Sequence, residues 1–98
     1  MQEQLLVYLR GNGLSSEVYE TCDTSTLDDL FSKALGDEGY VDGDETRETE
    51  TIMFLHGFDA EKMFELIEPV LRSYPLCEGA RIAIHPDPMK PPNREFTL

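Results

Sequence analysis

The apolar residues of the first quarter of the chain form one short run. "QLLVYL" at 4–9 is partly β-branched and aromatic, and it ends in the turn signal "RGNG". This pattern predicts a first β-strand. The following "EVYETC" at 17–22 is extended in character, so it either prolongs that strand after the turn or leads into a helix.

Two later stretches have the spacing of amphipathic helices. The first places Leu27, Leu30, Phe31, Ala34 and Leu35 on one face. Residues 24–26 offer N-cap candidates and Gly36 offers a stop, which predicts a helix over about 25–35. The second places Met63, Phe64, Ile67, Val70, Leu71 and Tyr74 on one face, with Asp59 as the cap. Pro69 predicts a kink or a break, because a mid-helix proline costs ~3 kcal/mol.

The remaining apolar runs predict three more strands. Tyr40 and Val41 begin one strand and residues 52–55 form the next, with a polar, acidic turn between them. Residues 80–86, "ARIAIHP", alternate in the manner of a strand with one buried face. Four prolines in residues 86–92 then predict that residues 87–98 form an extended, Pro-rich tail outside a single domain of residues 1–86.

The predicted order of elements is β, α, β, β, α, β. It corresponds to an α+β, ferredoxin-like domain in which two helices cover one face of a four-stranded antiparallel sheet. Residues 42–84, which include "ETIMFLHGFDAEKMFELIEPVLRSYPL" and "ARIAI", also resemble small bacterial proteins of unknown function. The resemblance covers under half of the chain. It implies a ferredoxin-like domain and assigns no catalytic residue.

Charge narrows the choice of partner. The chain has 20 acidic and 8 basic residues, for a formal net charge of −12. Nucleic acid and anionic membranes need clustered Lys and Arg, so we expect neither as a partner. The acids concentrate in residues 37–50, where Arg47 is the one basic residue. Such a segment attracts a basic protein, although a high charge also serves solubility alone.

The two central strands offer apolar side chains to both faces of the sheet. A sheet covered by helices on one face should instead alternate cleanly between apolar and polar residues. A second copy of the chain is the simplest cover, so we predict a homo-oligomer. The alternative is that these are tolerated surface residues. The predicted partner-binding residues are therefore Asp42, Asp44, Glu45, Glu48, Tyr8 and Met53.

Candidate catalytic and metal chemistry is weak. The stretch "FLHGFDAE" at 54–61 contains His56, for which the sequence offers no orienting group or nucleophile. Gly57 suits a turn. Asp59 caps the following helix, and its negative charge repels an anionic substrate. His56 and His85 lack a third metal ligand. Counted from Asp42, the sixth position of a calcium loop is Arg47 rather than glycine. We therefore predict no catalytic residue, metal or cofactor.

The cysteines and the N-terminus indicate a compartment. Cys22 and Cys77 lie far apart in the sequence without a CxxC pattern, so we interpret them as free thiols rather than a bridge. The first residues lack a basic region followed by a long apolar run. Both observations predict a cytoplasmic protein.

Three functional hypotheses from different classes follow, of which an enzyme is the least favoured, because the sequence offers no set of nucleophile and base. The first is a non-catalytic, self-associating protein-interaction domain, which by class analogy includes an acidic inhibitor or immunity-type partner of a basic protein. The alternative is a small-molecule or ion-sensing domain with a site at a dimer interface. Its expected ligand-binding residues are Arg10, Asn12 and His56.

Overall fold

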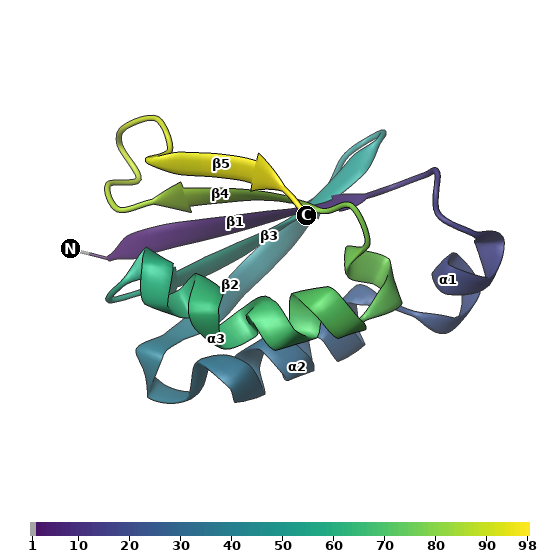
Figure 1. Cartoon of the computed structure of the whole chain (residues 1–98), viewed down its shortest axis with the longest axis horizontal. Coiled ribbons are helices and arrows are strands. Elements are labelled where there is room, and N and C mark those ends of the chain that lie inside the picture. The colour runs from purple at the N-terminus through teal and green to yellow at the C-terminus, as the bar shows by residue number, and fades with distance from the viewer. Residues whose placement is uncertain (1) are drawn as a thin grey trace.

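Five antiparallel strands form one sheet in the computed structural model, which describes residues 2–98. The strands are β1 (Glu3–Arg10), β2 (Gly39–Thr46), β3 (Glu50–Gly57), β4 (Arg81–His85) and β5 (Arg94–Thr97), in the spatial order β2-β3-β1-β4-β5. Helices α2 (Thr24–Leu35) and α3 (Ala60–Ser73) cover one face, and α1 (Ser16–Thr21) lies at one end of the molecule (Figure 1). Short 3₁₀ turns, η1 (Gly36–Glu38) and η2 (Pro75–Cys77), lead into β2 and toward β4.

The α+β class is confirmed, and the expected count of strands and helices is wrong. The predicted order of elements is present as β1-α2-β2-β3-α3-β4, with α1 and β5 added to it. Residues 17–22 are mostly helical rather than extended. Ser15 begins this helix by accepting a hydrogen bond from the Val18 N–H at 3.4 Å.

The C-terminal residues do not leave the domain. Arg94–Thr97 pairs with β4, and the Leu98 N–H donates to the Ala80 carbonyl at 2.8 Å. The Phe96 ring also meets Phe64 of α3 edge to face, with the ring centroids 5.2 Å apart. The prolines of residues 86–92 therefore form a connection within the domain, and the expected boundary at residue 86 is wrong.

The main core lies between the sheet and the two long helices. Leu5, Val7 and Leu9 of the central strand β1 are at most 2% exposed and face α2 and α3. Strand neighbours and both helices fill the same layer; they contribute Leu27, Phe31, Leu35, Met53, Leu55, Met63, Ile67, Ile82 and Ile84. Burial of each such side chain stabilises the fold by about 1.5–3 kcal/mol.

The helix starts follow the capping chemistry of the sequence. Asp59 accepts a hydrogen bond from the Lys62 N–H at 3.1 Å, which confirms it as the cap of α3. Helix α2 is capped by Asp23, one residue before the expected candidates. Hydrogen bonds from the Thr26 backbone N–H and hydroxyl lower the pKa of Asp23 below its ordinary value.

Two residues of the α3 region behave differently from expectation. Pro69 does not break α3, which continues from residue 60 to residue 73. Glu65 and Pro69 are both exposed, so water can bond the carbonyl that the proline leaves without an N–H. Gly57 is the buried end of β3 rather than a turn residue. A Cβ there would lie 2.3 Å from the Glu38 carbonyl oxygen, so only glycine allows β2, β3 and α3 to meet.

Candidate functional site

Most of the acidic segment forms an outer strand rather than a connecting turn. Asp42, Asp44 and Glu45 lie on β2, and Glu48 lies in the turn that joins β2 to β3. All four side chains are exposed. Strand β2 is the terminal strand of the sheet, and a β-bulge between Val41 and Gly43 interrupts its register. The sequence-predicted acids are thus brought together along one free sheet edge.

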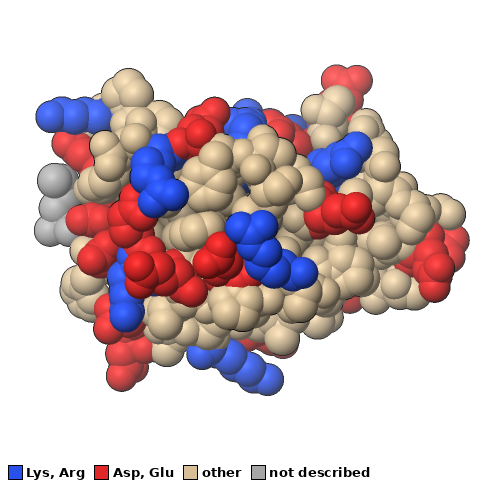
Figure 2. All heavy atoms as spheres, in the orientation of Figure 1, with Lys and Arg blue, Asp and Glu red and all other residues tan. Residues whose placement is uncertain are grey.

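These carboxylates are only partly neutralised. Glu45 contacts Arg47 at 3.1 Å, but both side chains are more than half exposed, so the pair contributes little. Asp42 lies 3.3 Å from the His56 ring. Within residues 2–98, Asp44 and Glu48 have no cationic group within 4.0 Å. The tip of the β2–β3 hairpin projects from the molecule (Figure 1) and carries acidic side chains (Figure 2).

His56 has the orienting carboxylate that the sequence did not reveal. Its Nδ1 lies 3.3 Å from Asp42, and its Nε2 lies 3.0 Å from the Gln4 side-chain nitrogen. In the tautomer protonated on Nδ1, the ring donates to Asp42 and accepts from Gln4. The Tyr40 ring packs edge-on at 5.9 Å. Both ring nitrogens are therefore occupied, which suits a histidine that fixes β2 to β1 and β3.

His85 lies on the opposite side of the central strand from His56. His56 on β3 and His85 on β4 are both register partners of Gln4. The backbone of each histidine is therefore one strand spacing, about 4.8 Å, from β1. His85 Nδ1 approaches the Lys90 carbonyl oxygen at 3.3 Å. Among residues 2–98, no group of three or more His, Cys, Asp or Glu side chains could hold a metal ion.

The residues of the ligand-binding alternative do not form one pocket within a chain. His56 lies opposite Gln4 in the register of β1 and β3. Arg10 is six residues further along β1 than Gln4, so Arg10 and His56 lie about 20 Å apart along the sheet. Arg10 instead lines a shallow cavity of about 260 Å³ with Arg81 and Glu50. Asn12 is exposed in the following turn and does not line that cavity.

Met53 does not lie on the open face of the sheet. It is 1% exposed and pairs with Val7 in the helix-side core, so its assignment to a partner-binding surface is wrong. Tyr8 is on the open face as expected, beside Ile52 and Phe54 of β3. The alternation of side chains along β3 places Met53 and Ile52 on opposite faces of the sheet. Because both faces are apolar, the sequence pattern did not show which of them packs against the helices.

The open face is largely covered by its own side chains. Leu6, Ile52 and Ala83 are at most 8% exposed, with Tyr8 and Phe54 packed around them. The guanidinium carbon of Arg81 lies 3.7 Å from the centre of the Tyr8 ring. The same guanidinium reaches Glu95 at 3.3 Å and Glu50 at 3.5 Å. Arg81 is not among the sequence-predicted site residues, although its place opposite Tyr8 follows from strand pairing.

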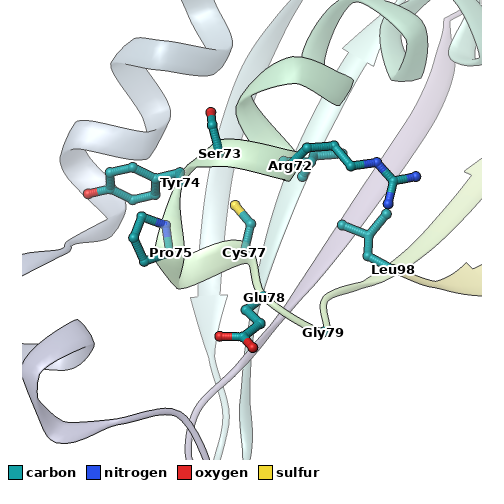
Figure 3. Close-up of a pocket in the computed structure, with 9 residues that line it drawn as sticks. Arg72, Ser73, Tyr74, Pro75, Cys77, Glu78, Gly79 and Leu98 are labelled. Atoms are coloured by element: carbon teal, nitrogen blue, oxygen red, sulfur yellow. The ribbon is translucent and has the colours of Figure 1, made fainter.

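A cavity of about 330 Å³ lies where α3 ends, and it contains the buried cysteine (Figure 3). Cys77 belongs to η2, and Arg72 extends across the hollow toward Leu98 (Figure 3). Burial, together with the charge of nearby Cys22, raises the pKa of Cys77 to about 12. Cys77 is therefore a protonated thiol at neutral pH and a poor nucleophile. Both cysteines are free.

Comparison with known proteins gave no match to a protein-family model, a curated protein or a solved structure. No helix within residues 2–98 has the length and apolar character that crossing a bilayer requires.

The raised pKa of Cys77 predicts a strong contrast in alkylation. At pH 8, iodoacetamide should modify the half-buried Cys22 at least tenfold faster than Cys77, because a thiol with a pKa of about 12 is almost wholly protonated at that pH. Mass spectrometry of tryptic peptides measures the two rates. In urea the contrast should vanish, and equal rates in the folded protein would contradict the burial of Cys77.

Proposed function

We propose that this chain is a non-catalytic, ferredoxin-like protein-interaction domain that binds a basic protein through its β2–β3 hairpin. The observation that supports this most directly is the set of exposed carboxylates Asp42, Asp44, Glu45 and Glu48 along the outer strand and its turn. At physiological salt their field reaches about 8 Å and speeds encounter with a surface of opposite charge. An acidic inhibitor of a basic protein fits this arrangement.

Exposed aromatic side chains favour binding over a purely solubilising role. Within residues 2–98, three large hydrophobic side chains are exposed, and two of them, Tyr40 at 44% and Phe58 at 74%, lie where β2 begins. The Phe58 N–H donates to the Glu38 carbonyl, so Phe58 is beside the start of this strand. Solubility gains nothing from exposed aromatic rings, whereas interfaces are enriched in them.

The same charge argues against other partners. A net charge of −12 repels nucleic acid and anionic lipid, so neither is part of the proposal. Two free cysteines in one small chain are typical of a reducing compartment, and we place the protein in the cytoplasm. A non-catalytic role is supported by His56, whose ring nitrogens are both occupied, and by the protonated thiol of Cys77.

Self-association through the open sheet face is the second part of the proposal. Leu6, Ile52 and Ala83 gather there with Tyr8 and Phe54, and the last two remain partly exposed. Charge on this face is better balanced than on the hairpin, because Arg81 contacts both Glu50 and Glu95. This balance lowers the repulsion between two copies that meet at this face.

Charge reversal on the hairpin should abolish partner capture. We compare the wild-type chain with a variant carrying Asp42, Asp44, Glu45 and Glu48 as lysines, each immobilised and exposed to an extract of the source cells. Proteins captured by the wild type should be basic and should elute as the salt concentration rises. The captured amount of each should be at least tenfold lower on the variant, because electrostatic attraction becomes repulsion. Quantitative mass spectrometry measures the captured amounts.

A matched control variant distinguishes the effect of the hairpin acids from the effect of the net charge of the whole chain. Changing Glu20, Asp29, Glu65 and Glu78 to lysine alters the net charge equally, and these exposed acids lie outside the hairpin. This control should retain capture of the same basic proteins. Equal loss with both variants would show that the acidity acts only through total charge and would refute the hairpin as the binding surface.

The chain should form a dimer through its open sheet face at micromolar concentration. Light scattering should give twice the mass of the chain, and Phe54→Lys should return the protein to a monomer with its fold intact, because it places a charge in the apolar face. Met89→Lys is the control, since Met89 is 89% exposed and lies outside this face. A wild-type protein that stays monomeric at millimolar concentration would end this part of the proposal.

A further inference from the structure

We infer that the outer edge of β2 accepts an extended basic segment of the partner as an additional strand of the sheet. The inference rests on the proposed function and specifies how the same surface would bind. Strand β2 pairs with β3 on one side only, so half of its backbone groups have no strand neighbour. Exposed sheet edges of this kind are templates for strand addition.

Register identifies the outward-facing backbone groups near the hairpin turn. The Arg47 N–H donates to the Glu50 carbonyl at 2.7 Å, so these two residues form a hydrogen-bonded pair. In an antiparallel ladder such pairs alternate with pairs whose N–H and C=O groups point away from the neighbouring strand. Thr46 and Asp44 occupy those alternate positions. Their N–H and C=O groups therefore face the free edge.

The other end of β2 has the same alternation of inward-facing and outward-facing backbone groups. The Phe58 N–H donates to the Glu38 carbonyl at 3.4 Å, which makes this a hydrogen-bonded pair. Gly39 and Val41 are then the alternate residues that direct backbone groups outward. The bulge at Asp42 lies between the two runs and offsets them by one residue. A partner strand would find donors and acceptors on both sides of the bulge.

Charge selects the occupant of this edge. A second copy of β2 would bring two sets of exposed carboxylates together and would be repelled, as native proteins commonly arrange for a free edge. A strand that carries Arg or Lys at alternate positions presents these side chains on one face of the sheet. Asp42, beside His56, and Glu45, opposite Ile52, share a face and meet such a strand with opposite charge instead. Tyr40 and Phe58 offer rings against which a guanidinium can stack. The occupant is therefore a basic, extended segment of a protein.

A synthetic peptide with the sequence Arg-Val-Arg-Val-Arg-Val-Arg tests the inference. It should bind the wild-type chain at least tenfold more tightly than Arg-Pro-Arg-Pro-Arg-Pro-Arg, which has the same charge but cannot form a strand ladder. Fluorescence anisotropy at fixed, low ionic strength measures both affinities. Equal affinities, or no binding of the valine peptide, would overturn strand addition.

Two substitutions at one position distinguish the contribution of the backbone hydrogen bond from that of the carboxylate charge. Asp44→Pro and Asp44→Asn remove the same carboxylate, but only proline removes the outward N–H, and proline is tolerated at such edge positions. The proline variant should bind the valine peptide about tenfold more weakly than the asparagine variant. Circular dichroism checks that each variant is folded, and Thr46→Pro against Thr46→Ala replaces the pair if Asp44→Pro unfolds.

The two proposals fail in different ways. If the proline and asparagine variants bind equally, strand addition is overturned, whereas capture of basic proteins that depends on the hairpin acids would still support the proposed function. Phe58→Ala should weaken the peptide severalfold if the ring stacks on an arginine. Met89→Ala, at a residue that is 89% exposed and lies away from the edge, should leave the affinity for the peptide unchanged.

Discussion

The burial of strand β1 on both faces is the constraint on which the rest of the structure depends. Leu5, Val7 and Leu9 fill the layer under the helices, while Leu6 packs on the opposite face beside Tyr8. A strand of this kind cannot be an edge, because both its backbone edges and both its side-chain faces must be covered. It therefore takes β3 and β4 as neighbours and brings α2 and α3 onto one face.

This central strand also decides where charge can lie. The middle of the sheet is apolar on both faces, and the acids Asp42, Asp44, Glu45 and Glu48 lie on the outer strand and at the hairpin tip. There they are solvated, and their repulsion discourages edge-to-edge pairing of two copies. The same placement leaves a free backbone edge next to exposed carboxylates and the Tyr40 and Phe58 rings. The solvation of these acids and the proposed binding thus depend on one feature of the fold.

Local patterns in the sequence predicted the elements that local chemistry determines. Strand β1, helix α2 and the Asp59 cap of α3 all follow from periodicity and capping residues. Strand β5 was missed because its four residues follow a proline-rich connection and are stabilised by tertiary contacts, above all Phe96 on Phe64. Met53 was placed on the wrong face because alternation alone does not say which face meets the helices. The contact of His56 with Asp42 depends on the register of β2 against β3, which the sequence did not reveal.

Amide hydrogen exchange with the arginine–valine peptide bound tests most directly the claim that the outer edge of β2 is the interaction surface. The N–H groups of Asp44 and Thr46 face the free edge, so their exchange should slow at least tenfold when the peptide pairs with them. The N–H of Glu45 points toward β3 in the free protein, and its exchange should change little. Unchanged exchange at Asp44 and Thr46, with protection centred on Tyr8 and Phe54, would place the interaction on the open sheet face and contradict the account.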